Sequence, residues 1–198
     1  MRRQIFAAAC ALAAMAAGSA LAAPGVEVDP LTRQPLVQRP GAVGADGRPL
    51  ATAIPREVVY FSGKYAPGTI VISTAERRLY YVLPDGQAIK YGVGVGRPGF
   101  EWGGVKHISQ KREWPDWTPP AQMLKRRPDL PRHMKGGENN PLGARAMYLG
   151  TSLYRIHGSN EPETIGQAVS SGCIRMTNED VIDLYSRVRV GTKVVVMR

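Results

Sequence analysis

The chain has 198 residues, a formal net charge of +10, 43% hydrophobic residues and 2 Cys. This length is enough for one domain with a proper core, and two cysteines are too few for a disulfide scaffold. The basic balance points to an anionic partner, such as nucleic acid, anionic lipid or an acidic polymer.

Residues 1–22 have the features of a secretory signal peptide. Two arginines follow Met1, a short apolar stretch comes next, and Ala20-Leu21-Ala22 is a small-x-small cleavage site. The alternative is an uncleaved membrane anchor. Because the apolar stretch is short and alanine-rich for a span of about 20 residues, we expect cleavage and no transmembrane anchor afterwards.

Residues 23–56 are expected to be a linker, because they are rich in proline and glycine and show no apolar periodicity. A spacer is the preferred interpretation, with a partner-binding segment as the open alternative. Residues 57–198 then form a single catalytic domain of about 140 residues. A cleaved signal and a short tether without an anchor suit a soluble protein beneath an outer membrane, so we expect a periplasmic location.

The first part of this domain has the pattern of β-strands. Short segments rich in β-branched and aromatic residues, separated by Gly, Pro and Asp, lie at 58–61, 69–73, 78–83 and 87–95. Pro84-Asp85-Gly86 predicts a hairpin turn between two of them. The glycines near residue 95 do not form a G-x-G-x-x-G pattern opening a helix, which excludes a nucleotide-binding loop.

Residues 97–146 are expected to hold a strand over 103–110 and then a long loop interrupted by prolines. A loop of this length inside a compact domain is usually a lid or a binding segment. It contains all three tryptophans and an excess of Lys and Arg. Trp117 is a candidate wall of a substrate cleft, and core packing is the alternative that stays open.

The last part is expected to contain strands at 146–150, 153–157 and 193–197, and a short helix over 161–168. Thr177 predicts the N-cap of the principal helix, because Asp180 three residues later completes a capping box. Apolar residues at i, i+3, i+4 and i+7 form one face of this helix: Val181, Leu184, Tyr185 and Val188. The expected fold is mainly β, a sandwich or barrel with one principal helix after the cysteine motif and a long lid-like insertion.

Two short segments, Ile156-His157-Gly158 and 170–176 (SSGCIRM), carry the residue types of a cysteine nucleophile. A thiol needs a base to ionise it, backbone N–H groups to hold an oxyanion, and a glycine where the chain turns tightly. An isolated cysteine is more often an inert buried thiol, but these neighbours favour a nucleophile. We therefore expect Cys173 as nucleophile, His157 as base, and the N–H groups of Gly172 and Cys173 as oxyanion donors. The N-terminus of the following helix would also favour the thiolate.

The two segments resemble the signature of the L,D-transpeptidase catalytic domain, built around H-G…S-H-G-C-x-[RN]. Further landmarks extend the resemblance to roughly residues 68–197: Trp117-Thr118-Pro119-Pro120, Asn140-Pro141-Leu142-Gly143 and Thr177-Asn178-Glu179-Asp180. The resemblance implies a β-rich fold, His157 as general base oriented by the carbonyl of Gly158, and no cofactor. The family often has a second histidine where this chain has Ser171, which leaves the role of a second imidazole open.

Four further residues are candidates for substrate binding. Arg175 either binds a substrate carboxylate bidentately or holds the motif loop by capping carbonyls. Ser170 and Ser171 are expected to support the turn through side-chain to backbone bonds, with substrate contact as the alternative. Tyr154 is a candidate cleft residue, although aromatic residues that flank strands often belong to the core.

Neither a metal site nor nucleic-acid binding is expected. His107, His133, His157 and Cys173 have none of the spacings typical of metal ligands. Export separates the protein from nucleic acid, so its basic surface more naturally meets anionic wall peptides, glycan or lipid.

The resemblance implies an exported transpeptidase acting on peptidoglycan stem peptides. Cys173 would form a thioester with a tetrapeptide stem and release its terminal D-alanine. An amine would then resolve the thioester, giving a 3→3 cross-link or anchoring a protein, with an outer-membrane protein or lipoprotein among the acceptors. The resemblance also implies acylation by carbapenems. The alternatives are a carboxypeptidase or amidase on the same scaffold, and a non-catalytic peptidoglycan-binding protein.

Overall fold

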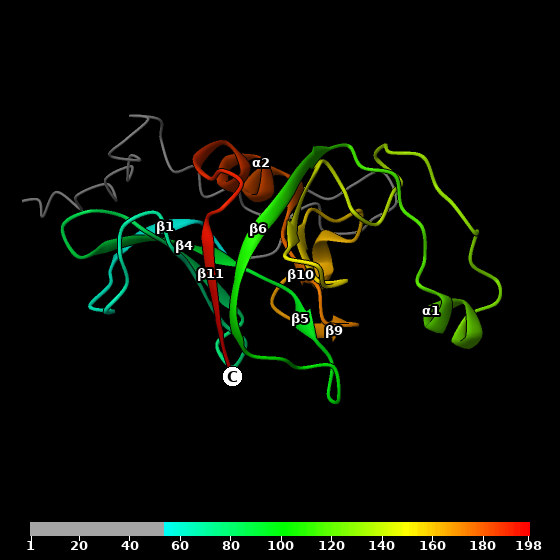
Figure 1. Cartoon of the computed structure of the whole chain (residues 1–198), viewed down its shortest axis with the longest axis horizontal. Helices are drawn as coiled ribbons and strands as arrows, with labels where there is room; N and C mark the ends of the chain where they lie inside the picture. The colour runs from blue at the N-terminus through cyan, green and yellow to red at the C-terminus, as the bar shows by residue number, and fades with distance from the viewer. Residues whose placement is uncertain (1–53) are drawn as a thin grey trace, which may run out of the picture.

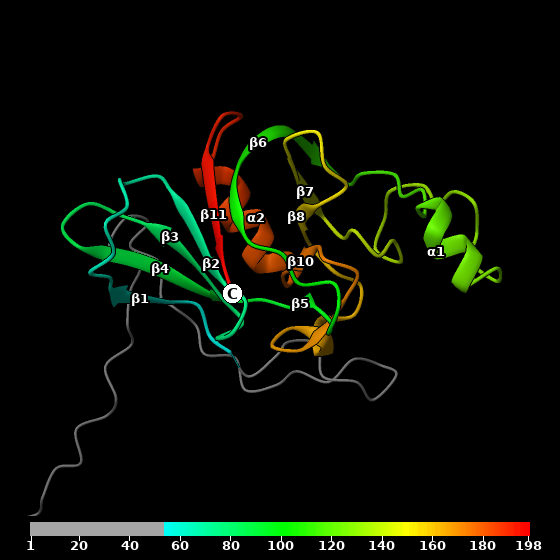
Figure 2. The same ribbon diagram turned by 60° about the horizontal axis from the view of Figure 1, so that its bottom comes forward.

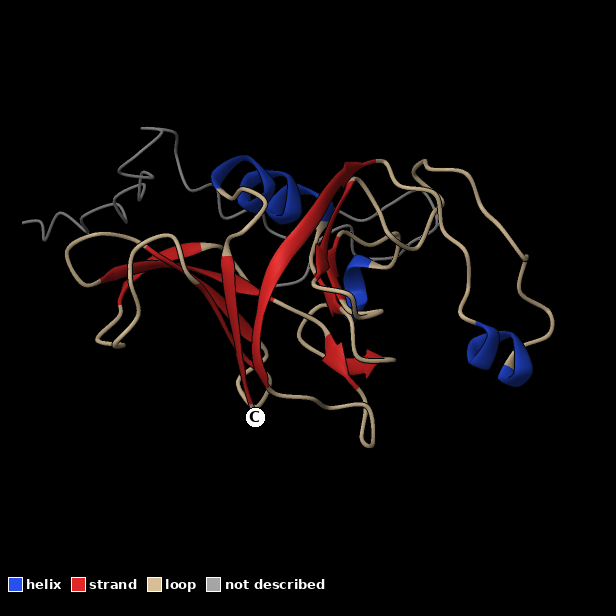
Figure 3. Cartoon of the chain, in the orientation of Figure 1, coloured by secondary structure: helices blue, strands red, loops and turns tan. Residues whose placement is uncertain are grey.

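The computed structural model describes residues 54–198, so the expected signal peptide (1–22) and all but the last residues of the expected linker (23–56) lie outside the described residues. The described part is mainly β with one principal helix, as expected (Figure 1, Figure 3). No helix between residues 54 and 198 combines the length and the apolar character needed to cross a membrane.

The elements follow one another along the chain, and most strands join one sheet. In order they are β1 (Glu57–Tyr60), β2 (Ile70–Ser73), β3 (Arg78–Val82), β4 (Gln87–Gly92), β5 (Val95–Gly96), β6 (Gly104–Glu113), α1 (Ala121–Arg126), β7 (Arg145–Leu149), β8 (Arg155–His157), the 3₁₀ turn η1 (Pro162–Thr164), β9 (Ala168–Ser170), β10 (Ile174–Arg175), α2 (Asn178–Arg187) and β11 (Lys193–Met197). Nine strands form a sheet in the order β1-β4-β3-β2-β11-β6-β7-β8-β10, and β5 pairs with β9.

The long strand β6 joins two wings of this sheet. Its first part, 104–107, pairs with β11, and its second part, 108–113, pairs with β7, with a register shift between Ile108 and Gln110. A bulge of this kind bends a strand and increases its twist. Figure 2 shows the consequence: β1 to β4 and β11 lie on one side of β6, and β7, β8 and β10 on the other.

The first wing forms as its sequence predicts. β2 is buried on both faces, which suits a continuous apolar run between two neighbours, β3 and β11. The predicted hairpin turn between β3 and β4 is confirmed, with φ of 59° at Asp85 and 68° at Gly86. Two successive positive φ values are those of a type I′ turn, which matches the twist of the flanking strands.

Helix α2 is fixed at both ends. At its start the hydroxyl of Thr177 accepts a hydrogen bond from Asp180 N at 3.1 Å, which confirms the predicted cap. At its end Lys111 Nζ of β6 donates to the carbonyls of Tyr185 and Val188 at 2.7 and 2.6 Å. A cation at this position stabilises the helix, because it interacts favourably with the negative end of the helix dipole. The predicted apolar face packs into the core, with Val181 and Leu184 fully buried.

Two predicted elements around the motif need correction. The expected helix over 161–168 is only the turn η1, because Gly166 has φ of +84° and Ala168 already begins β9. The expected strand over 87–95 divides into β4 and β5, because the chain leaves β3 after Gly92 and pairs with β9. A Cβ at Gly94 would lie 2.9 Å from Thr164 O, so a glycine is needed for the segment between β4 and β5 to pass close to η1.

The long insertion between β6 and β7 holds a helix that the sequence did not predict. Helix α1 begins directly after Pro119 and Pro120, so these prolines precede the helix instead of interrupting it. Figure 2 shows α1 at the tip of the insertion, away from the sheet. The side chain of Arg126 on α1 reaches back to Phe100, with its guanidinium carbon 5.5 Å from the ring centroid.

Candidate active site

The pairing of β8 with β10 brings the two sequence motifs together. The strands run parallel, with Ile156 beside Ile174 and His157 beside Arg175. The two isoleucines are buried in the core. Because side chains alternate along a strand, His157 faces the opposite side of the sheet together with Cys173, which immediately precedes β10. The two reactive side chains are diagonal neighbours, about 7 Å apart at Cβ by this register.

His157 is held in one tautomer by its own backbone. Its side chain is buried, and Nδ1 lies 2.6 Å from the carbonyl oxygen of Gly158. Because a carbonyl only accepts, Nδ1 carries the proton and Nε2 keeps its lone pair. Burial and the charges of Arg175 and Arg155 lower the pKa of His157 to about 3, although its bond to Gly158 acts in the other direction. The imidazole is therefore neutral near pH 7.

The backbone at Gly158 packs against a residue to which the sequence assigned no role. Asn178, the first residue of α2, accepts a hydrogen bond from Ala144 N at 2.8 Å through Oδ1. The same oxygen lies directly against Gly158 and Gly143, where a Cβ would clash with it. Its position next to the predicted cap Thr177 was the signal that could have identified it.

Cys173 is half-buried, and its thiol hydrogen bonds to the carbonyl of Leu153 with Sγ and O 3.7 Å apart. Burial raises the pKa of the thiol. The charge and the backbone hydrogen bond of Arg155, together with the charge of Arg175, lower this pKa but only partly offset the effect of burial. Four residues, 174–177, lie between Cys173 and the first residue of α2. The expected effect of the helix N-terminus on the thiolate stays a prediction.

In the resting state the thiol and the imidazole are therefore both neutral. We expect the ultraviolet thiolate absorbance of the protein, measured against the Cys173→Ala variant, to titrate above the ordinary cysteine pKa of about 8.5. The reason is the burial that raises the pKa of Cys173. A titration midpoint below pH 7 would instead indicate a preformed thiolate–imidazolium pair.

A network of hydrogen bonds shapes the turn before Cys173. The hydroxyl of Ser170 accepts from Gly172 N at 3.1 Å and donates to Cys173 O at 2.6 Å, which is the supporting role expected for this serine. The N–H of Gly172 is thus engaged within the turn. Among the described residues the N–H of Cys173 has no hydrogen-bond partner, so it is the better placed of the two expected oxyanion donors. Ser171 is half-buried in this turn. Its hydroxyl makes none of the expected side-chain to backbone bonds with the described residues.

Trp102 and Tyr154 form the wall of the turn. Their rings stack with centroids 4.5 Å apart and an interplanar angle of 3°, and Trp102 Nε1 donates to Gly172 O at 2.7 Å. Tyr154 therefore lies beside the motif turn and also packs against the core. Its role in substrate binding stays a prediction. Trp117 lies elsewhere. It is buried within the insertion, where its backbone exchanges two hydrogen bonds with Met134. The tryptophan that reaches the motif is Trp102, whose role the sequence did not distinguish.

Arg175 holds the segment that follows the histidine. Its guanidinium Nη1 lies 2.9 Å from Glu161 Oε2 and 3.4 Å from the hydroxyl of Thr164, and both partners belong to the η1 region. Its backbone also exchanges two hydrogen bonds with Gly94. The side-chain contacts differ from the expected capping of motif-loop carbonyls, because the acceptors are side chains of the η1 region. Binding of a substrate carboxylate by Arg175 stays a prediction. In residues 54–198 no three His, Cys, Asp or Glu side chains are grouped closely enough to hold a metal ion.

Gly172 should tolerate no side chain. Its φ is +105°, and a Cβ there would lie 2.6 Å from the ring of Tyr154. We expect Gly172→Ala to lower the free energy of unfolding by about 2–4 kcal/mol through backbone strain plus the clash. Gly191→Ala is the matched control, because its φ is +90° and nothing lies within 4 Å of the added Cβ. It should cost only about 1 kcal/mol. Equal losses in chemical denaturation would contradict this account of the turn.

Comparison with known proteins identifies the family of the chain. The family model of the L,D-transpeptidase catalytic domain matches residues 67–196. The chain is 41% identical over 134 residues to the probable L,D-transpeptidase ErfK/SrfK of Escherichia coli, covering 63% of this chain and 42% of that protein. It is 40% identical over 135 residues to the probable L,D-transpeptidase YbiS of the same organism, covering 63% and 43%. The chain thus spans less than half the length of these relatives.

Solved structures show the same fold. An L,D-transpeptidase from Mycobacterium smegmatis superposes with a TM-score of 0.53 at 17% identity, covering 66% of this chain and 58% of that one. L,D-transpeptidase 3 from Mycobacterium tuberculosis superposes with a TM-score of 0.53 at 18% identity, covering 66% of this chain and 60% of that one. Because the family model spans well over half of the residues, the chain belongs to the L,D-transpeptidase catalytic-domain family.

Proposed function

We propose that this protein is a cysteine acyltransferase that forms a thioester with a peptidoglycan tetrapeptide stem and passes the acyl group to an amine. One observation carries the proposal. A neutral imidazole, fixed by the carbonyl of Gly158, shares one face of the β8–β10 pair with the thiol of Cys173. Membership of the L,D-transpeptidase family supplies the substrate class.

In the first half-reaction Sγ of Cys173 attacks the carbonyl carbon that joins the third stem residue to the terminal D-alanine. Nε2 of His157 takes the thiol proton as the S–C bond forms, and the N–H of Cys173 faces the developing oxyanion. His157 then returns the proton to the amide nitrogen as the C–N bond breaks. D-alanine leaves with a free amine, and the thioester remains on Cys173.

In the second half-reaction an amine attacks the thioester carbon and loses a proton to Nε2 of His157. The C–S bond breaks and the proton returns to Sγ, which restores the resting thiol. An amine from another stem gives a 3→3 cross-link, and an amine of an outer-membrane protein or lipoprotein anchors that protein to the wall. Export through the expected signal peptide (1–22) would place the enzyme in the periplasm with these acceptors.

Mass spectrometry of products formed from purified tetrapeptide muropeptides tests the proposal. Transfer gives a cross-linked dimer together with free D-alanine, which is the expected result. Tripeptide without dimer would identify a hydrolase on the same scaffold. Unchanged tetrapeptide that still binds the protein would identify a non-catalytic wall-binding protein. Addition of a free D-amino acid provides a second amine acceptor and should give an exchanged tetrapeptide.

A further inference from the structure

Arg155 occupies the reactive face of the sheet beside the nucleophile. It is the first residue of β8 and pairs with Tyr148 on β7. The parallel register of β8 and β10, Ile156 with Ile174, places Arg155 next to Cys173. Its charge acts on both reactive groups, favouring the thiolate of Cys173 and the neutral form of His157. No role for Arg155 is predicted from the sequence.

Arg155 differs from the neighbouring arginines because none of residues 54–198 supplies it with a counter-charge. Arg175 is paired with Glu161 at 2.9 Å, and Arg145 is paired with Glu113 at 3.2 Å. Within the described part of the chain, Arg155 forms no ion pair, and its Nε is buried without a hydrogen-bond partner. A buried donor of this kind is costly to leave unpaired, and such exceptions call for an explanation.

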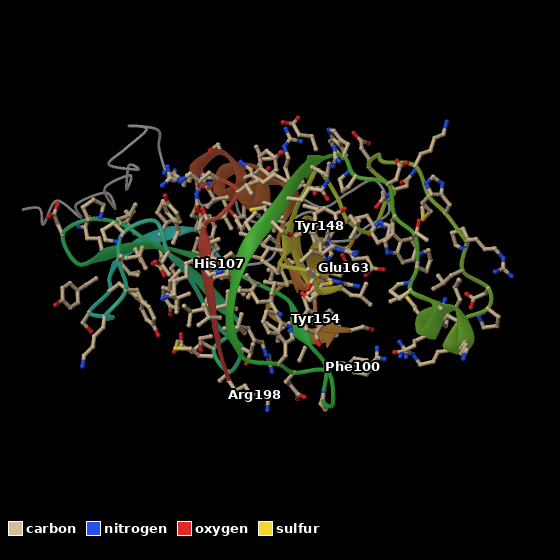
Figure 4. All side chains as sticks on the ribbon, viewed as in Figure 1. Phe100, His107, Tyr148, Tyr154, Glu163 and Arg198 are labelled. Carbon is tan, nitrogen blue, oxygen red and sulfur yellow. The ribbon has the colours of Figure 1, made fainter. Side chains whose placement is uncertain are left out.

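The side chain is nevertheless held in position. Its guanidinium carbon lies 5.2 Å from the ring centroid of Tyr148, a cation–π arrangement that orients the planar fork. Figure 4 shows Tyr148 and Tyr154 on the same side of the structure, with Phe100 beyond Tyr154. In the described part of the chain, no hydrogen bond engages the Nη groups of Arg155, and these are not among its buried unpaired atoms. Arg155 is therefore a preorganised cation beside the thiol whose Nη donors are available for a ligand.

We propose that Arg155 binds the terminal carboxylate of the leaving residue and so restricts the enzyme to stems whose scissile bond is the last one. The inference rests on the proposed function. A guanidinium prefers a carboxylate, which it can bind through two parallel hydrogen bonds. In a terminal residue the carboxylate is separated from the scissile nitrogen by a single carbon. A cation beside Sγ is therefore suitably placed to bind it while the carbonyl faces Cys173.

The test compares two substrates that differ only in this group: a tetrapeptide stem ending in D-alanine and the same stem ending in D-alaninamide. The measured quantity is the ratio of their kcat/KM values for release of the terminal residue. Because both substrates meet the same thiol, any effect of Arg155 on the pKa of Cys173 cancels in this ratio. We expect the wild type to prefer the free acid by about 30-fold or more, as for charge-assisted hydrogen bonds.

Arg155→Met should remove this preference and bring the ratio close to one, whereas Arg155→Lys should retain part of it through the charge alone. Arg145→Met is the matched control. Arg145 also lies over an aromatic ring, Tyr185, at 5.5 Å, but its charge is paired. This variant should keep the wild-type ratio. If Arg155→Met does not fold, Arg155→Lys and the wild type decide the question.

Two results would overturn the inference while leaving the proposed function intact: a wild type that releases D-alanine and D-alaninamide equally well, or Arg155 variants that keep the wild-type preference. A wild type that releases neither group, despite intact folding, would overturn the proposed function and with it this inference. Alkylation of Cys173 by iodoacetamide, which carries no carboxylate, measures separately how each substitution alters the thiol.

Discussion

Replacing Cys173 by alanine is expected to abolish transfer from tetrapeptide stems, with a fall in turnover on the order of 10⁴–10⁶-fold. The sulfur is the atom that accepts the acyl group, and no other cysteine lies between residues 54 and 198. The fold should persist, because a half-buried thiol contributes little packing and the turn is held by Ser170 and Trp102. The free energy of unfolding should change by about 1 kcal/mol or less.

The measurement combines steady-state release of D-alanine with thermal unfolding of the same preparation. Cys173→Ser serves as a second variant, since it keeps a nucleophilic atom of weaker reactivity and should also lose nearly all turnover. Wild-type product formation by a folded Cys173→Ala protein would refute the mechanism. A loss of activity accompanied by unfolding would refute the expectation that the thiol is dispensable for the fold.

Replacing His157 by glutamine is expected to lower kcat/KM by about 10²–10⁴-fold, the usual contribution of a positioned general base. Glutamine places its amide near the position of Nε2 and does not reproduce the bond that Nδ1 donates to the carbonyl of Gly158. It offers no nitrogen that can take the thiol proton. Iodoacetamide alkylation of Cys173 at neutral pH should slow as well, because the thiol then loses its base.

The pH profile separates this role from a structural one. Burial and neighbouring arginines lower the pKa of His157 to about 3, below the ordinary value of 6.5. The base form therefore persists as the pH falls through 6.5, and kcat/KM of the wild type should show no loss between pH 7 and 5 that belongs to this histidine. A decline with a midpoint near pH 6.5 that is absent from His157→Gln would contradict the buried, neutral imidazole.

Much of the fold could be predicted because its signals are local. Asp85 and Gly86 supply the two positive φ values of a hairpin turn, and Thr177 with Asp180 begins the principal helix. The pairing of β5 with β9 could not be predicted in this way. It joins residues far apart in sequence, and each strand is too short to show a period. Pro119 and Pro120 were interpreted as breakers although they lie directly before α1.

The candidate site shows the same division between local and long-range information. The contact of His157 with Gly158 and the bonds of Ser170 within its turn involve neighbours in sequence, so the motif alone could suggest them. The roles of Trp102 and Arg155 depend on which strands lie side by side. Trp102 becomes part of the site only because its indole reaches Gly172, 70 residues away. Arg155 has the appearance of an ordinary strand arginine until the register places it next to Cys173.

The most direct test of the central claim is the mass of the intact protein after brief exposure to a tetrapeptide stem in the absence of an amine acceptor. We predict an increase equal to the acyl tripeptide, that is, the tetrapeptide less its terminal D-alanine. Peptide mapping should locate it on Cys173, and hydroxylamine should remove it as expected for a thioester. An acyl adduct on any other residue, or turnover that proceeds without a covalent adduct in rapid-quench samples, would contradict the mechanism.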